Sequence, residues 1–334
     1  MITEQGAKNP NEVNDRKISL INALKDNKIL TIVIEPASKC NLRCTFCDAH
    51  SGRAEEFRKH AGLMSIDTFN VIANKIEEYV LKYNQKIEMI QFHGNGEPLL
   101  HKNLPEMISI LKKKNIANSL RVITNGVLLK KDKVKSLIES GIDEIHLSLD
   151  TIDKESYLRT KKRNQIEMVL KNVDEAIEIF ENTKGPQFYI KYFRPSDHLE
   201  YEVKAEDSYA VINKYKDRAK DSKYVHLKEQ ILVDTGLGML KGNVIEKPCE
   251  NPFYLIYAMH TGKISACCSD VYNQLTIGEI EGQSLEEIMK GKILREIRQA
   301  HLDANFEKYP LCKGCGNRTA MDLTEIQDQI QSLI

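Results

Sequence analysis

The chain has 334 residues, of which 41% are hydrophobic, and its 48 acidic and 48 basic side chains give a formal net charge of zero. This length allows one large domain with an appendage, and the apolar content is sufficient for a sizeable core. A zero net charge, with lysines spread along the predicted helices, argues against a nucleic-acid partner. No stretch approaches the roughly 20 apolar residues of a membrane span, and residues 1–26 lack the apolar core of a signal peptide. We therefore expect a cytoplasmic protein with no membrane partner.

Strands and helices are predicted to alternate after a leader, residues 1–28, which is a short helical or loose segment and too short for a separate peptide-recognition domain. The predicted strands are 29–35, 88–93, 120–124, 144–149 and 188–193, with a sixth within 224–233. The predicted helices begin after Ser65, lie near 104–114, cover 132–140 before Gly141, and begin after Asn164. Repeated βα units predict a parallel sheet, whose functional sites gather at the carboxyl ends of the strands. Residues 196–245 are more charged and less regular, and we expect them to end this unit and to cover the active site.

Eight cysteines in a chain expected to be cytoplasmic favour metal binding over disulfides. Three of them, Cys40, Cys44 and Cys47, form a C-x3-C-x2-C loop directly after the first predicted strand. Three thiolates on one short loop can hold three irons of a cubane cluster and leave the fourth iron open for chemistry. Zinc is the alternative, but a zinc site usually takes its ligands in pairs from two places, and no fourth ligand follows closely. The spacing therefore favours an iron–sulfur cluster.

Further motifs follow the predicted strands in order. Phe46 precedes the last cysteine of the loop, and the later motifs are Gly94-Asn95-Gly96-Glu97-Pro98, the strand ending in Asn125-Gly126, and Ser148-Leu149-Asp150 followed by Arg159. Over about residues 29–195, this series resembles the radical S-adenosylmethionine (radical SAM) superfamily. It departs from the usual pattern by carrying Asn95-Gly96 where the family has Gly-Gly.

The resemblance implies an α/β fold, a partial (β/α)6 barrel over residues 29–235. It implies a [4Fe–4S] cluster on Cys40, Cys44 and Cys47, whose open iron binds the amino and carboxylate groups of S-adenosylmethionine (SAM). One electron, from a flavodoxin or ferredoxin-type donor, would cleave SAM to methionine and a 5′-deoxyadenosyl radical. That radical would remove a hydrogen atom from the substrate, and the oxygen sensitivity of such a cluster suggests an anaerobic or microaerobic setting.

The resemblance also assigns contacts with SAM. Glu97 is expected to fix the amino group, and Gly94 and Gly96 to let the backbone approach the ligand closely. Ser148 and Arg159 are expected to hold the ribose or the carboxylate, because a guanidinium group suits a carboxylate. The structural alternatives are a loop carboxylate that accepts backbone N–H bonds, an ordinary turn, and a solvated arginine.

Two more residues complete the predicted SAM site. Phe46 is expected to lie near the adenine, with core packing as the alternative, and Asn125 is expected among the cofactor-binding residues. His93, His101 and His198 could lie near the same rim, although a single histidine is more often structural.

A second cysteine set lies near the C-terminus and comprises Cys249, Cys267, Cys312 and Cys315. Residues 254–257 and 263–266 flank Thr261-Gly262 and predict a hairpin that brings the first two cysteines together. A helix that begins with a capping box at Ser284 would return the C-x2-C pair. Four thiolates suit zinc and a closed iron–sulfur cluster equally well.

Beside the barrel, this arrangement resembles the shortened SPASM domain called a twitch domain, a small α+β unit placed at residues 236–320. The resemblance implies one auxiliary [4Fe–4S] cluster, and no cysteine follows Cys315 to support a second. Four-cysteine ligation leaves little room for substrate on the iron, so electron transfer is its expected task. Residues 321–334 are expected to form a C-terminal helix.

Cys268 neighbours a predicted ligand and has no partner cysteine. It is either a small buried residue or an alternative ligand to Cys267, or a thiol that gives a hydrogen atom to a substrate radical, as in radical SAM epimerases. Asp270 is either a catalytic base or a residue that closes a turn.

Three functions follow from these patterns. The favoured one is oxidation of a small molecule, such as a sugar or aminocyclitol, with the auxiliary cluster as electron acceptor. The second is a radical epimerase acting on a sugar or peptide, or a peptide maturase. The third is a structural metal-binding or redox-sensing protein. The short leader favours a small-molecule substrate over a peptide.

Overall fold

A computed structural model of the chain describes residues 10–26, 28–52, 54–194, 204–231, 248–313, 315, 323 and 326–334. These residues form one nine-stranded sheet in the order β6-β5-β4-β3-β2-β1-β7-β8-β9. The strands are β1 (Thr31–Ile34), β2 (Ile87–Phe92), β3 (Ala117–Thr124), β4 (Glu144–Ser148), β5 (Gln187–Arg194), β6 (Val225–Ile231), β7 (Leu255–Ala258), β8 (Lys263–Ser265) and β9 (Thr276–Glu279).

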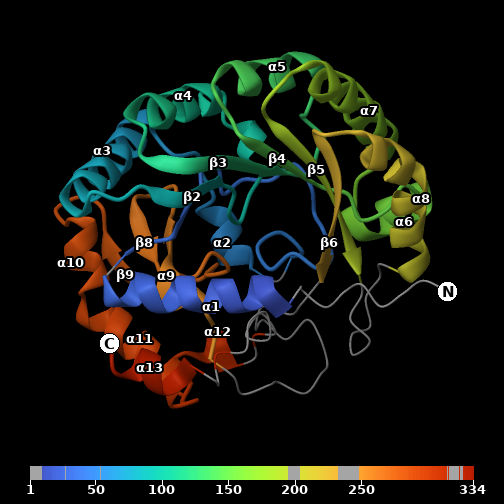
Figure 1. The fold of residues 1–334 in the computed structure, drawn as a ribbon. Coiled ribbons are helices and arrows are strands. Elements are labelled where there is room, and N and C mark those ends of the chain that lie inside the picture. The colour runs from blue at the N-terminus through green and yellow to red at the C-terminus, as the bar shows by residue number, and fades with distance from the viewer. Residues whose placement is uncertain are drawn as a thin grey trace.

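The first six strands form a parallel, partial barrel. Each pairs in parallel with the next along the chain, and Figure 1 shows helices α3, α4, α5, α7 and α8 arranged around the convex side. The expected α/β partial barrel is thus confirmed, and the sixth strand, placed only loosely by the sequence, is β6.

The helices are α1 (Pro10–Lys25), α2 (Glu55–Lys59), α3 (Ile66–Tyr83), the 3₁₀ helix η1 (Pro98–Leu100), α4 (Leu104–Lys114), α5 (Lys131–Glu139), α6 (Lys154–Lys161), α7 (Ile166–Asn182), α8 (Ala205–Asp221), α9 (Asn251–Tyr254), α10 (Leu285–Met289), α11 (Lys292–Leu302), α12 (Pro310–Lys313) and α13 (Gln327–Gln331).

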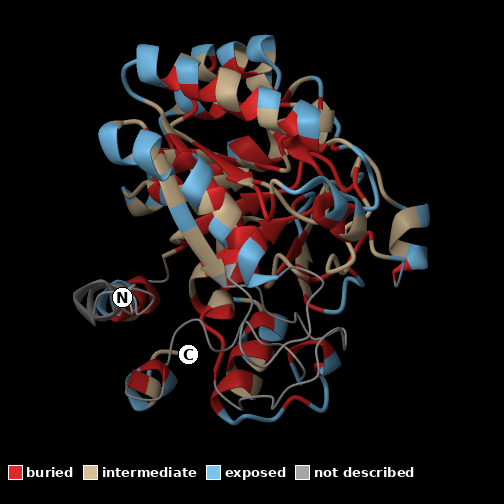
Figure 2. Cartoon of the chain, turned by 90° about the vertical axis from the view of Figure 1, so that its right-hand side faces the viewer, coloured by how far each residue is buried: buried red, intermediate tan, exposed pale blue. Residues whose placement is uncertain are grey.

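Local signals explain some of the helix starts and ends. The Ser65 side chain accepts a hydrogen bond from Thr68 N and caps α3, as predicted. α5 ends at Ser140, and Gly141 follows with a left-handed φ of +90°. The prediction for α7 was wrong by one residue, because Gln165 and not Asn164 is the N-cap, and its side chain makes no capping bond. Figure 2 shows the buried residues concentrated along the sheet and the inner helix faces.

The C-terminal part of the chain continues the same sheet. The predicted hairpin is the antiparallel pair β7 and β8, with Gly262 in a left-handed conformation between them. β7 also pairs in parallel with β1, in register from Thr31 with Leu255 to Ile34 with Ala258. Backbone hydrogen bonds therefore fix the C-terminal region to the barrel. The predicted boundary at residues 235/236 lies outside the described residues.

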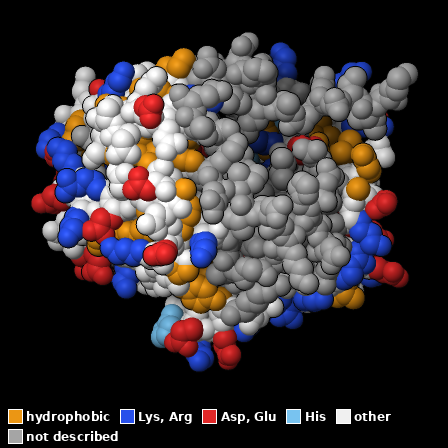
Figure 3. Space-filling model, turned by 90° about the horizontal axis from the view of Figure 1, so that it is seen from below, with side chains coloured by type: hydrophobic (Ala, Val, Ile, Leu, Met, Phe, Trp, Pro, Cys, Tyr) orange, Lys and Arg blue, Asp and Glu red, His pale blue; other side chains and the backbone are white. Residues whose placement is uncertain are grey.

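The two ends of the described chain pack together. The leader is helical from Pro10 to Lys25, and its Leu20 and Leu24 share an apolar cluster with Phe253 and Ile330. In the predicted C-terminal helix, the described helical residues are the five of α13. None of the described helices is both long and apolar enough to cross a membrane. Lys or Arg and Asp or Glu side chains are interspersed on the described part of the face in Figure 3.

Candidate active site

The three-cysteine loop lies at the carboxyl end of β1 and is tied to the end of α6. Arg43 N donates to Lys161 O at 3.1 Å, and Thr45 N donates to Thr160 O at 2.8 Å. Burial raises the pKa of Cys40 and of Cys47 to about 12, and the charge of Cys44 adds to each shift. The charges of the three cysteines therefore influence one another, and their joint binding of a cluster stays a prediction.

Lys161 places a buried positive charge beside this loop. Its ammonium group is paired with the buried carboxylate of Asp150 and lies 4.6 Å from the centroid of the Phe46 ring. Burial raises the pKa of the Cys44 thiol, and the charge of Lys161 opposes that rise. A cation next to a thiol favours the thiolate that binds metal. Sequence reasoning missed this residue, because it treated the lysine clusters on helices as solvated surface.

Glu97 joins the Gly-rich loop to the end of β3. Its buried carboxylate accepts hydrogen bonds from Leu99 N at 3.1 Å, Thr124 Oγ1 at 2.7 Å and Asn125 N at 2.9 Å. Burial raises its pKa to about 6, and these three bonds oppose the rise. The geometry matches the structural alternative, a loop carboxylate that accepts N–H bonds, and contact with the SAM amino group stays a prediction.

Gly96 is required because the chain approaches itself closely at this point. A Cβ there would lie 2.3 Å from Ala37 O and 2.4 Å from Lys39 O, in the segment that leads into the cysteine loop. Gly94 has a φ of +149°, and a Cβ would lie 2.7 Å from the Tyr257 hydroxyl oxygen. At both positions the absence of a Cβ lets other parts of the protein approach the backbone closely. The contacts of these glycines with a ligand stay predictions.

Asn125 is brought to the cysteine loop, as the sequence motifs suggested. Its side-chain amide donates to Asn41 Oδ1 at 2.7 Å and lies 3.8 Å from Cys40 Sγ. The Phe46 ring makes an edge contact with Phe193 on β5, with centroids 5.9 Å apart. Phe46 therefore belongs to the rim, between the loop and β5.

Arg159 lies on α6 and contacts Ser156 and Asp207. Its guanidinium donates to Ser156 Oγ at 2.7 Å and lies 4.0 Å from Asp207 Oδ2, toward α8. Ser148 ends β4 and pairs in register with Lys191 on β5. The basic residue of α6 beside the cysteine loop is Lys161. The predicted contacts of Ser148 and Arg159 with SAM stay predictions.

Polar side chains line the concave face of the sheet below the rim. Arg121 Nη2 lies 2.7 Å from Glu144 Oε2, and His146 Nε2 lies 2.8 Å from the same oxygen. Burial and the charges of Lys191 and Arg121 lower the pKa of His93 to about 3, so this histidine is neutral. Two further histidines had been placed near the rim. His101 is structural, since its Nε2 hydrogen-bonds Met64 O at 2.8 Å, and His198 lies outside the described residues.

The charges of the four C-terminal cysteines influence one another, and their joint binding of a cluster stays a prediction. Burial raises the pKa of Cys249, and the charges of Cys315 and Cys312 add to the shift. Burial likewise raises the pKa of Cys267, with further contributions from Cys268, Cys249 and Cys315. The described His, Cys, Asp and Glu side chains include no group of three or more that is gathered for a single metal ion. An all-thiol set in a protected setting fits an iron–sulfur cluster, whose binding would displace the thiol protons.

Cys268 and Cys267 take part in different clusters of side chains. Cys268 packs against the apolar group of Val33, Leu255, Tyr257 and Met259, and Cys267 packs against the main core. Asp270 closes a turn, because its carboxylate accepts bonds from Ser265 Oγ, Gln274 N and Leu275 N at 2.8 to 3.0 Å. Its predicted role as a base stays a prediction.

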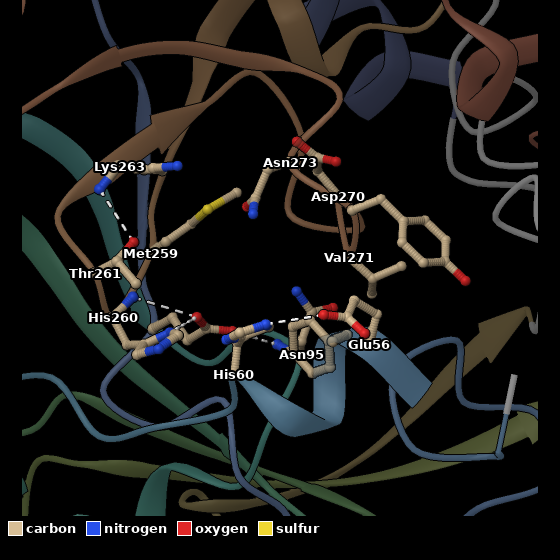
Figure 4. A pocket seen from close by; sticks show the side chains of 13 residues that line it. Glu56, His60, Asn95, Met259, His260, Thr261, Lys263, Asp270, Val271 and Asn273 are labelled. Atoms are coloured by element: carbon tan, nitrogen blue, oxygen red, sulfur yellow. Dashed lines mark hydrogen bonds and ion pairs between the residues drawn. The ribbon is translucent and has the colours of Figure 1, made fainter. Parts of the chain in front are cut away.

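Glu35, which sequence reasoning missed, lies at the junction of barrel and hairpin. Its buried carboxylate accepts from Asn95 N at 3.0 Å, from His260 Nδ1 at 3.0 Å and from the Tyr257 hydroxyl. It lines a cavity of about 190 Å³ that is bounded by α2, the Gly-rich loop and residues 259–273 (Figure 4). The Asn95 side chain, at the position where the motif departs from Gly-Gly, takes part in this junction.

Two protein families match successive segments of the chain, and each segment contains one of the two cysteine sets. Residues 34–191 match the radical SAM superfamily, and residues 249–316 match the SPASM iron–sulfur cluster-binding domain. The chain belongs to the radical SAM superfamily. Membership, with the C-terminal SPASM match, implies [4Fe–4S] clusters and SAM as its cofactors, and the two thiol sets described above have the chemistry to hold those clusters.

Curated relatives match only part of this radical SAM chain. The probable GTP 3′,8-cyclase of Methanococcus maripaludis is 39% identical over 141 residues, which is 42% of this chain and 43% of that protein. The GTP 3′,8-cyclase of Chlorobaculum tepidum is 34% identical over 144 residues, which is 43% of this chain and 40% of that protein. The chain therefore spans less than half the length of these relatives.

Solved structures of other radical SAM proteins share the fold over most of this chain. BtrN in complex with AdoMet and 2-DOIA has a TM-score of 0.58 at 19% identity and covers 86% of this chain and 93% of its own. anSMEcpe with bound AdoMet has a TM-score of 0.59 at 17% identity and covers 91% of this chain and 95% of its own. At these identities the likeness shows the fold.

Proposed function

We propose that this radical SAM protein oxidises a small molecule, such as a sugar or aminocyclitol, with a C-terminal auxiliary cluster as the electron acceptor. The observation that supports the proposal is the set of four cysteines Cys249, Cys267, Cys312 and Cys315 within the segment that matches the SPASM iron–sulfur cluster-binding domain, in a region fixed to the barrel by the β1–β7 pairing. A closed set of four thiolates suits electron transfer better than substrate binding.

When bound, SAM and the first cluster would supply a 5′-deoxyadenosyl radical, and the second cluster would be the electron acceptor. The protein orients and protects them. Cys40, Cys44 and Cys47 would hold the first cluster, with Lys161 stabilising the thiolate form. Glu97 keeps the Gly-rich loop against β3. An alcohol would lose one hydrogen atom to the radical, then a proton and the second electron, and would become a ketone.

Radical epimerisation is the second candidate, and the position of Cys268 favours it. Its side chain lies against Val33 and Tyr257, separate from the packing of Cys267. A thiol in this position could return a hydrogen atom to a substrate radical. The sulfur radical left on Cys268 would become a thiol again by taking one proton and one electron, the electron coming from the flavodoxin or ferredoxin-type donor. Epimerisation would leave the oxidation state of the substrate unchanged, whereas oxidation of an alcohol would not. The cyclase activity of the curated relatives is not carried over, because those matches cover less than half of this chain.

Iron content and SAM cleavage after anaerobic reconstitution test the proposal. Two cubanes predict about eight irons per chain, and about four when Cys40, Cys44 and Cys47 are all replaced by Ala. That variant should also lose 5′-deoxyadenosine formation. A matched variant with Ala at Cys249, Cys267, Cys312 and Cys315 should also hold about four irons but still cleave SAM. A chain that binds about four irons and one zinc would have no electron acceptor, and the oxidation would be wrong.

A further inference from the structure

A buried tyrosine on α6 carries a hydroxyl group without a hydrogen-bond partner in the described part of the chain. Tyr157 is 2% exposed, and its Oη is buried and bonded to none of the described residues. Leaving a buried hydroxyl group unbonded is costly, and nearly all buried polar groups in native proteins are bonded to protein, water or a bound group. The Tyr157 hydroxyl therefore indicates a partner that is not part of the polypeptide.

The buried face of α6 is turned toward the three-cysteine loop. The buried residues of this helix are Ser156, Tyr157, Thr160 and Lys161. The last two are bonded to the backbone of the loop, because Thr160 O accepts from Thr45 N at 2.8 Å and Lys161 O accepts from Arg43 N at 3.1 Å. Tyr157 therefore belongs to the face of α6 that is tied to the loop.

Tyr157 and Lys161 project from the same side of α6, because residues four apart on a helix are neighbours. The Lys161 ammonium group lies 4.6 Å from the centroid of the Phe46 ring, within the cysteine loop. Burial raises the pKa of the Tyr157 hydroxyl; the charge of Lys161 opposes this rise, and those of Cys44 and Cys40 add to it. The hydroxyl group thus lies on the loop side of the helix, one turn from the cation that contacts the loop.

An iron–sulfur cluster on this loop fits the unbonded hydroxyl. The sulfur atoms of such a cluster accept hydrogen bonds, and these bonds help to set its reduction potential. A tyrosine hydroxyl can donate one such bond. The other buried donor on this face, Lys161, is already paired with Asp150. The side chain that is left to bond the cluster from α6 is therefore Tyr157.

We propose that the Tyr157 hydroxyl donates a hydrogen bond to a sulfur atom of the first cluster and raises the reduction potential of that cluster. The bond is stronger in the reduced cluster, which carries one more negative charge, so it favours uptake of the electron that SAM cleavage needs. The inference rests on Cys40, Cys44 and Cys47 holding the cluster. It goes beyond the proposed oxidation, because oxidation and epimerisation both start from the reduced first cluster.

An EPR-monitored reductive titration of the anaerobically reconstituted full chain tests this bond. The first cluster gives the signal that changes when SAM is added and that is missing when Cys40, Cys44 and Cys47 are all replaced by Ala. Tyr157→Phe should make reduction of this cluster about three- to tenfold less favourable, as expected for one lost hydrogen bond. For one electron, this change is a midpoint potential about 28–59 mV more negative. The iron content of the variant should equal that of the wild type.

Tyr215→Phe is the matched control. Tyr215 is also 2% exposed, but it lies on α8, on the convex side of the sheet (Figure 1). Its neighbour Lys214 is paired with Asp174 of α7 at 3.9 Å. This variant should keep the wild-type midpoint of the first cluster. The signal that does not respond to SAM, from the auxiliary cluster, should have the same midpoint in the wild type and in both variants.

Several outcomes would overturn the inference. An unchanged midpoint in Tyr157→Phe, or an equal shift in Tyr215→Phe, would show that the Tyr157 hydroxyl is not bonded to the cluster. Weaker SAM binding by Tyr157→Phe at an unchanged midpoint would make SAM its partner instead. A wild-type chain without a SAM-sensitive signal would remove the first cluster itself. The proposed oxidation fails separately, because the absence of the auxiliary cluster alone would leave the SAM-sensitive signal and its response to Tyr157→Phe in place.

Discussion

Asn95 donates its side-chain amide hydrogen to the Tyr257 hydroxyl oxygen at 3.2 Å, and so joins the Gly-rich loop of the radical SAM core to the first strand of the C-terminal hairpin. The Tyr257 hydroxyl in turn donates to Glu35, which also accepts from Asn95 N. The residue that departs from the family motif is therefore the one that connects the two cofactor regions. A glycine at this position could not make the side-chain bond.

The Asn95–Tyr257 bond predicts a measurable coupling. Asn95→Ala and Tyr257→Phe should each lower the free energy of unfolding by about 0.5–1.5 kcal/mol, because each removes hydrogen bonds from the network around the buried Glu35 carboxylate. The double variant should lose about 1 kcal/mol less than the sum of the two. Urea unfolding of the four proteins measures this difference. Strict additivity would mean that the bond contributes nothing to stability.

Replacing one partner of the buried Lys161–Asp150 pair should lower the free energy of unfolding strongly. Lys161→Met should lower the free energy of unfolding by about 3–5 kcal/mol, since it leaves the Asp150 carboxylate buried without its cation. Adding Asp150→Asn should recover part of that loss. Denaturant unfolding gives the stability, and iron content gives the effect on the first cluster.

Lys162→Met is the control for the Lys161 substitution. Lys162 is the adjacent residue, is exposed, and already has a positive φ of 55° in the native chain. Its replacement should change stability by about 0.5 kcal/mol or less. If the two variants lost stability equally, the effect would come from the helix end and not from the buried ion pair.

The buried His146 should make the free energy of unfolding depend on pH. Burial lowers its pKa to about 4, and nearby cations add to this shift against the opposing bond to Glu144. A histidine with a folded pKa below its unfolded value of about 6.5 contributes full stability above pH 6.5 and loses it as the pH falls toward 4. Between pH 7.5 and 5.5 the loss from this residue should be about 1 kcal/mol. His146→Gln should remove that part of the slope, and identical slopes in the two proteins would contradict the assignment.

The sequence indicated the barrel because its first four strands are short and each is followed by a motif, and all six strands are present in the structure. The three-cysteine loop was also indicated, since spacing within a short segment constrains geometry directly. The second cysteine set spans residues 249–315, so its grouping depended on the resemblance to the twitch domain. Long-range relationships were missed. Nothing local in residues 255–258 indicates pairing with β1, and Lys161 resembles any lysine of an exposed helix until the fold places Asp150 against it.

Arg159 also shows that the sequence does not indicate where a side chain on a helix points. It has the charge and the approximate position that the motif requires, yet α6 turns it toward Asp207 and presents Lys161 to the cysteine loop, two residues later. On a helix, residues two apart face different directions. A motif match that allows a variable spacing therefore cannot choose between two basic residues this close together.

Adding a side chain at Gly96 should cause a steric clash, and its effect can be distinguished from the backbone strain caused by replacing a glycine that has a positive φ. Gly96→Ala would place a Cβ within 2.6 Å of three backbone atoms of residues 37–39, so the segment before Cys40 must move. We expect a loss of about 1–3 kcal/mol in stability, typical of overpacking, together with a lower iron content and slower SAM cleavage. Gly52→Ala is the control, because Gly52 has a φ of +111° but nothing within 4 Å of a built Cβ. It should lose about 1–2 kcal/mol from backbone strain and keep its iron. Equal iron loss in both variants would show that the glycine conformation, and not the close approach of Gly96 to the cysteine loop, supports the first cluster.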